Sequence, residues 1–148
     1  MKRRLLLPIC LLASAATLPA YGDDPRLVEA KIVFNTYDGG NDKDANSKLK
    51  ITVFSVFGSS GFVRVAAQND WETYGRFADG TINPIVLRIQ GTTTLTGLSD
   101  LKLKLEFEPN GDDTWKFSYD LSLKFSDGTI LSRQGPRTEL SDKVRVLE

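Results

Sequence analysis

The sequence predicts an all-β protein, an antiparallel β-sandwich of about eight strands. Two neighbouring runs, 101–108 and 115–125, alternate apolar with charged or polar residues. Because successive side chains of a strand point to opposite faces, each run forms a strand with one apolar face. After residue 22 no segment shows a sustained helical period, so these apolar faces are expected to pack against a second sheet.

The two alternating runs are joined by the turn-forming residues Pro109, Asn110 and Gly111. This arrangement predicts one long antiparallel hairpin with a single solvent-exposed face. Its apolar positions are expected to form the core, namely Leu103, Leu105, Phe107, Trp115, Phe117, Leu121 and Leu123.

Strands are also expected before this hairpin, at residues 28–36, 48–57, 62–67, 71–77 and 85–89. Within 48–57 the apolar positions change phase at Phe54, which indicates a bulge or burial on both sides. Pro84 stands where a strand can begin without losing a ladder hydrogen bond.

After the hairpin, Asp127-Gly128 predicts a two-residue turn into a short strand at 129–133. Gly135-Pro136 is expected to end that strand. Leu140, Val144 and Val146 suggest a final edge strand.

Residues 1–22 are expected to be a secretory signal peptide, because a basic start leads into an apolar run and then into small residues. Cleavage is expected after Gly22, with cleavage after Ala20 as the alternative. The remaining residues, 23–148, form a single exported domain, periplasmic or secreted. No segment is long and apolar enough to predict a transmembrane span.

Composition narrows the possible chemistry. The chain has no histidine, and its one cysteine, Cys10, lies in the expected signal peptide. Ser-His-Asp and Cys-His catalysis and histidine-containing zinc sites are therefore excluded. Paired carboxylates could in principle hydrolyse glycosides, but no two can be placed at the required separation and a small sandwich offers no evident cleft, so the protein is not expected to be an enzyme. Loss of Lys2, Arg3 and Arg4 turns a balance of 19 basic and 19 acidic residues into a slight acidic excess, which argues against a nucleic-acid partner.

The loop between the first two expected strands is rich in oxygen-bearing side chains: Asp38, Asn41, Asp42, Asp44 and Asn46. Calcium takes six to eight oxygen ligands from carboxylates, amides and carbonyls, so these residues are candidate metal ligands. The alternative is that Asp, Asn and Gly simply form a solvated turn.

Simple alternation of strand direction predicts which other acidic residues share an end with this loop. It places Asp70, Asp100 and Asp127 beside the loop, and Asp79 at the opposite end with Asp112-Asp113. A chain that crosses between sheets would break this alternation.

Two aromatic residues, Trp71 and Tyr74, lie in the weakest of the expected strands. They are a candidate platform on which sugar rings could stack. Packing into the core is the alternative.

Three short stretches stand out: Lys43-Asp44-Ala45-Asn46, the run Leu49–Phe54 followed by Phe57-Gly58, and Asn110-Gly111 ahead of Trp115. Together they resemble the first loop, the second strand and a tryptophan-led strand of PLAT/LH2 domains. That resemblance implies an eight-stranded, C2-like β-sandwich that binds lipids, membranes or partner proteins, in some members through calcium. By position it makes Asp42, Asp44 and Asn46 the expected calcium ligands.

Two functions are therefore expected. The first is an exported, stand-alone PLAT-like binding module that contacts lipid, envelope or a partner protein, with calcium as its expected cofactor. The alternative is a carbohydrate-binding or inhibitor-like sandwich without a functional metal site.

Overall fold

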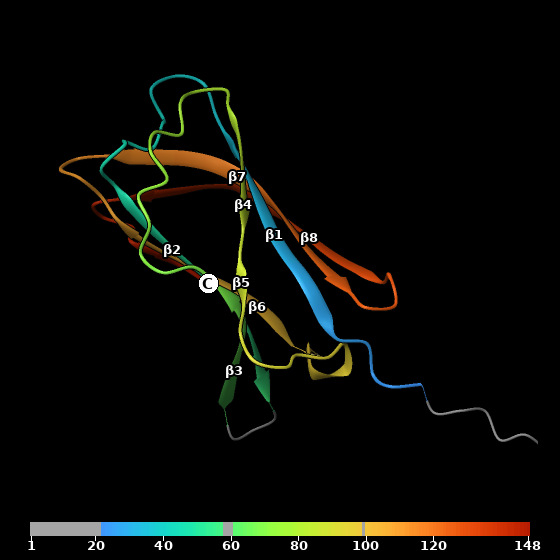
Figure 1. Cartoon of the computed structure of the whole chain (residues 1–148). Helices are drawn as coiled ribbons and strands as arrows, with labels where there is room; N and C mark the ends of the chain where they lie inside the picture. Colours follow the sequence, from blue (N-terminus) through green and yellow to red (C-terminus); the bar gives the residue numbers. More distant parts are fainter. Residues whose placement is uncertain (1–21, 58–60, 99) are drawn as a thin grey trace, which may run out of the picture.

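The computed structural model describes residues 22–57, 61–98 and 100–148, which form two antiparallel sheets packed face to face (Figure 1). The expected signal peptide lies outside these residues except for Gly22, so it stays a prediction. The four-stranded sheet has the order β4 (Ile82–Val86), β1 (Leu27–Thr36), β7 (Thr114–Phe125), β8 (Ile130–Ser141). The five-stranded sheet has the order β5 (Arg88–Ile89), β3 (Phe62–Gln68), β2 (Lys48–Phe57), β6 (Leu101–Glu108), β9 (Val146–Leu147).

The predicted all-β sandwich is confirmed. The helical element of the described residues is a single 3-10 turn, η1 (Thr96–Leu98). Across the same residues, no helix has the length and apolar character needed to span a membrane.

The core lies between the two sheets and contains all seven residues expected there. Strand alternation explains this burial, since β7 buries every second side chain from Trp115 to Phe125. Aromatic rings are concentrated near the start of β7, where Trp115 stacks on Phe117 at 3.9 Å and lies 5.0 Å from Phe34, measured between ring centroids.

The predicted hairpin of residues 101–125 is wrong, because β6 and β7 belong to different sheets. β6 pairs with β2 and β9, whereas β7 pairs with β1 and β8. Alternation predicts one buried face for each strand, but it does not say which strands are neighbours. The two apolar faces meet across the core, and residues 109–113 are long enough to cross the roughly 10 Å between sheets.

A bulge lies beside Phe54, but in the neighbouring strand instead of within 48–57. Val53 pairs with Ala67 and Phe54 with Val65, so the extra residue is Ala66 of β3, while β2 alternates without interruption. Ser55 takes the inward position that follows and is fully buried. Phe54 and Val56 therefore point outward from the five-stranded sheet, where they are partly exposed.

The strand expected at 71–77 does not form. This segment contributes isolated pairs, Glu72 with Leu49 and Phe77 with Lys43. Tyr74 has φ 53° and Gly75 has φ 71°, and a strand cannot continue through two left-handed residues.

The strand expected at 85–89 is divided between the two sheets. β4 pairs with β1, and β5 pairs with β3. Leu87 lies between them, buried, and its N–H donates to the carbonyl of Ala30 at 2.8 Å. Periodicity cannot distinguish one strand from two that continue each other in opposite layers.

β8 continues through Gly135-Pro136, so the predicted break is wrong. Tyr119 pairs with Gly135 and Phe117 with Thr138, which leaves an extra residue on β8 as a bulge. β8 is an edge strand, where the missing N–H of Pro136 is tolerated. The predicted hairpin at Asp127-Gly128 forms, but its loop has three residues, 126–128, instead of two. The Phe125 N–H donates to the Thr129 carbonyl at 2.8 Å, and the Gly128 N–H donates to the Phe125 carbonyl at 2.9 Å.

Replacing Gly135 by Ala is expected to destabilise the fold by about 1–3 kcal/mol. A Cβ there would lie 2.0 Å from Cε1 of Tyr119, whose ring covers this glycine. Chemical denaturation measures the loss, and Gly97→Ala, whose Cβ meets a hydroxyl at 3.2 Å, should lose less. Combining Gly135→Ala with Tyr119→Val should cost less than the two single changes added together, and simple additivity would contradict the proposed contact.

Candidate functional site

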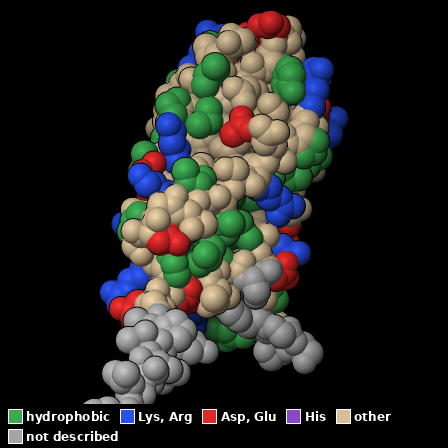
Figure 2. Space-filling view, turned by 90° about the vertical axis from the view of Figure 1, so that its right-hand side faces the viewer, with side chains coloured by type: hydrophobic (Ala, Val, Ile, Leu, Met, Phe, Trp, Pro, Cys, Tyr) green, Lys and Arg blue, Asp and Glu red, His purple; other side chains and the backbone are tan. Residues whose placement is uncertain are grey.

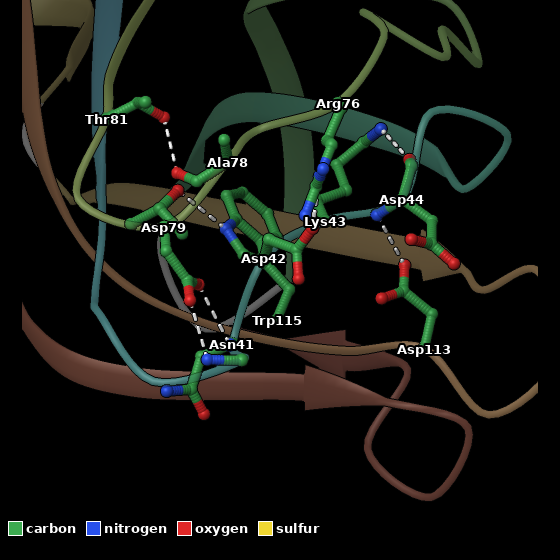
Figure 3. Close-up of polar contacts among 12 residues, drawn as sticks. Asn41, Asp42, Lys43, Asp44, Arg76, Ala78, Asp79, Thr81, Asp113 and Trp115 are labelled. Carbon is green, nitrogen blue, oxygen red and sulfur yellow. Dashed lines mark hydrogen bonds and ion pairs between the residues drawn. The ribbon is translucent and has the colours of Figure 1, made fainter.

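Three loops meet at one end of the sandwich: residues 37–47, 69–81 and 109–113 (Figure 3). Asp79 and Asp113 lie here against the acidic loop, which contradicts the expectation from simple alternation. The strand pairings place Asp100 and Asp127 towards the other end. The expectation failed because the strand predicted at 71–77 does not form, so every later strand runs opposite to its expected direction.

The Asp79 carboxylate organises the start of the acidic loop. It accepts the backbone N–H groups of Gly39 at 3.1 Å, Gly40 at 2.6 Å and Asn41 at 3.0 Å. Gly39 and Gly40 have φ values of 99° and 74°, which let consecutive N–H groups turn towards one carboxylate. The bonds from Gly40 and Asn41 are the main reason why the pKa of Asp79 lies below its usual value.

Lys43 is fully buried at the centre of this end. Its ammonium group donates to the backbone carbonyls of Thr73 at 2.5 Å, Gly75 at 2.8 Å and Asp44 at 2.9 Å. It also lies 5.1 Å from the centroid of the Phe77 ring. Burial lowers the pKa of Lys43 to about 8, against the opposing effect of the Asp113 and Asp44 carboxylates.

Asp113 ties the third loop to the other two. Its Oδ2 accepts the backbone N–H of Asp44 at 3.0 Å and the hydroxyl of Ser47. The Ser47 hydroxyl in turn accepts the backbone N–H of Asn110 at 2.9 Å. The three loops are thus held together by polar contacts between residues that are distant in sequence.

The five candidate metal ligands have separate surroundings. Asp42 pairs with Arg76, with 2.5 Å between Oδ2 and Nε. Asn41 is buried, and its amide donates to the Asp38 carbonyl at 2.7 Å. Asp38, Asp44 and Asn46 are exposed. Among the described residues, no three or more acidic side chains are grouped closely enough to hold a metal ion.

The oxygen atoms at the centre of the three loops therefore do not fit a calcium site. Backbone carbonyls are the kind of oxygen that calcium binds, and here three of them bond to an ammonium group that belongs to the chain. Calcium binding by the five candidate residues stays a prediction.

The two candidate platform residues differ in their surroundings. Trp71 is 44% exposed. Tyr74 is half-buried, packs against Phe77 with 6.2 Å between ring centroids, and accepts a hydrogen bond from the Asn69 amide at 2.6 Å. Burial raises the pKa of Tyr74. Tyr74 also lines a pocket of about 370 Å³ beside Arg88, so the carbohydrate alternative stays open there.

Comparison with protein-family models, curated proteins and solved structures finds no match. The resemblance to PLAT/LH2 domains stays a prediction.

Sequence reasoning gave no role to Lys43 or Arg76, and it placed Asp79 and Asp113 at the wrong end of the sandwich. One local signal was present for Asp79, because consecutive glycines before Asn41 can turn their N–H groups towards an anion. Nothing local marks the carbonyls that surround Lys43, since they come from a segment some thirty residues away.

A second candidate surface lies at the opposite end, where β2 and β3 project from the sandwich (Figure 1). We call Phe54, Val56, Phe62, Val63 and Val65 the hairpin end. Val56 pairs with Val63, and Phe54 pairs with Val65. Phe62 is 59% exposed and Val63 is 50% exposed.

Because Phe62 and Val63 are consecutive in a strand, their side chains point to opposite faces of the hairpin. Both are exposed, so solvent reaches both faces and the hairpin extends beyond the cover of the other sheet. A groove of about 420 Å³ follows its outward face, lined by Phe54, Val63 and Val65 among other residues.

Charges beside the hairpin end are balanced in sign. Lys102 lies 3.3 Å from an oxygen of Asp100, and Lys50 lies 3.6 Å from an oxygen of Glu106. The face in Figure 2 shows the same mixture, with basic side chains along both flanks and separate apolar clusters between them. The hairpin end is therefore an apolar surface without a strong local field.

Proposed function

We propose that this protein is an exported binding module that attaches to a lipid surface through the hairpin end. The observation that carries the proposal is the exposure of apolar side chains on both faces of a projecting hairpin. Exposed apolar patches of this kind mark interaction surfaces.

A lipid interface suits this geometry better than a flat protein surface. A flat partner would cover one face of the hairpin and leave Phe62 or Val63 in water. Lipid headgroups and acyl chains would surround both faces. Each of these half-exposed side chains would contribute about 1 kcal/mol on burial, which gives weak and reversible attachment.

The proposed attachment does not require calcium. Lys43 supplies a positive charge to the loops at the other end, and the hairpin end is formed by residues of β2 and β3. Because the neighbouring charges are paired, attachment is expected to depend on apolar contact and to change little with salt.

Co-sedimentation with vesicles tests the proposal. The unmodified protein is expected to bind phosphatidylcholine vesicles, and vesicles with added phosphatidylglycerol, equally well in calcium and in chelator. Val63→Asp should weaken binding at least about tenfold, because a carboxylate would enter the apolar interface. Val28→Asp is the matched control, since Val28 is 52% exposed on the other sheet, and it should bind normally.

Two results would contradict this proposal. One is the absence of vesicle binding by the unmodified protein, and the other is normal binding by Val63→Asp. Binding seen in calcium but not in chelator would instead support the five candidate metal ligands of the acidic loop.

A further inference from the structure

The two sheets part along the side where β8 and β9 are edge strands, and a pocket of about 250 Å³ opens there. Its apolar walls are Leu103, Tyr119, Pro136 and Leu147. Leu103 and Tyr119 come from opposite sheets and are 4% and 8% exposed. The pocket therefore reaches the margin of the core between the layers.

The bulge of β8 shapes this opening. Tyr119 pairs with Gly135, and its ring occupies the space that a side chain at residue 135 would need. Pro136 and Thr138, on either side of the extra residue, both line the pocket. Gly135-Pro136, which was expected from the sequence to end the strand, thus belongs to a bulge that forms one wall of the pocket.

Charged residues line the same pocket. Lys102 is paired with Asp100 at 3.3 Å, and the Glu148 side chain lies 3.8 Å from Lys104. Arg133 is exposed, and its Nη1 donates to a neutral acceptor, the Leu101 carbonyl, at 3.2 Å. A guanidinium carries five N–H donors, so Arg133 retains the capacity to bind a carboxylate.

We infer that this pocket binds an aliphatic monocarboxylate of medium chain length, with the chain between Leu103 and Tyr119 and the carboxylate at Arg133. The volume exceeds the roughly 150 Å³ of a dry protein cavity that accepts benzene. Lys102 and Arg133 outnumber the one lining carboxylate, Glu148, which is itself paired with Lys104, so the charge at the opening favours an acid over an alcohol of the same length. This inference is independent of the hairpin end, because the ligand is a soluble molecule and the pocket uses other residues.

Calorimetry or NMR titration of the exported protein with butanoate, hexanoate and octanoate, below micelle-forming concentrations, tests the inference. Affinity should rise about fourfold for each added methylene while the pocket fills. Octanol should bind at least about tenfold more weakly than octanoate, because it cannot form the charge-assisted bonds.

Two variants locate the site. Arg133→Gln should weaken octanoate about tenfold and leave octanol unchanged, whereas Lys124→Gln, an exposed cation of β7, should leave both unchanged. Thr138→Phe should fill the pocket and abolish both interactions, with Leu147→Phe as the second filling variant if the first does not fold. Affinity that does not rise with chain length, or normal octanoate binding by Arg133→Gln, would overturn the inference.

Discussion

Replacing Lys43 by Met is expected to lower the free energy of unfolding by about 3 kcal/mol. Met keeps the apolar length of the side chain but cannot donate to the carbonyls of Asp44, Thr73 and Gly75. Each carbonyl left without a partner costs about 1 kcal/mol or more. Chemical denaturation measures the loss, and Lys48→Met, which removes an exposed lysine paired with Glu108, should change stability by less than about 1 kcal/mol.

The difference in unfolding free energy between the unmodified protein and Lys43→Met is expected to increase with pH above pH 8. The pKa of Lys43 is about 8 in the folded protein, against a usual 10.5. Between these pH values the unfolded chain holds a proton that the folded protein has released, so the unmodified protein should gain stability relative to Lys43→Met as pH rises from 8 towards 10.5. Below pH 8 the difference should stay constant. Equal stability of the two proteins at pH 7 would show that the ammonium does not hold the loops.

Phe117→Ala is expected to cost about 3–5 kcal/mol, because it removes a fully buried ring and leaves a cavity. Phe117 stacks on Trp115 at 3.9 Å and meets Phe34 edge-on at 5.3 Å, so both neighbours lose contact. Ile82→Ala, at a side chain 69% exposed, should cost less than about 0.5 kcal/mol. Thermal or chemical denaturation of the pair provides the measurement, and a cost below about 1 kcal/mol for Phe117→Ala would contradict its place in the core.

Periodicity identified most strands of this protein because it reports which side chains are buried. Lys48–Phe57 begins and ends where the pattern predicted. The change of phase at Phe54 instead marks two apolar side chains, Phe54 and Val56, on the outward face, since the nearby bulge belongs to β3. The same information does not identify pairing partners. β6 and β7 have equally regular patterns, yet they face each other across the core instead of sharing a sheet.

The middle of β8 shows a second limit of sequence-based prediction. Gly135-Pro136 would interrupt a central strand, but β8 lies at an edge, where a bulge and a missing N–H are tolerated. Whether a strand lies at the edge or in the centre of its sheet depends on the whole fold. The sequence around Gly135-Pro136 therefore could not show that a bulge and a proline would be tolerated there.

The acidic loop was recognised from its composition, but the partners of its side chains were not. Lys43 has a charged side chain, and lysine is rarely buried without a partner. Its partners include the backbone carbonyl groups of residues 73 and 75. Because every residue has a backbone carbonyl, nothing in the sequence marks these two as partners of a lysine. Pairing of Asp42 with Arg76 likewise depends on a segment that was expected to be a strand.

The position of β1 has a consequence for the order in which the chain can fold. β1 comes early in the sequence, but its neighbours are β4 and β7, and β2 likewise needs β6. Local hairpins such as β2 with β3 can close early, whereas the central pairs join residues separated by about 46 to 98 positions. Such long-range pairing slows folding, because a large loop must close before its contacts form. A chain that emerges N-terminus first therefore cannot build either sheet strand by strand in sequence order. The sandwich forms only when residues beyond 114 become available.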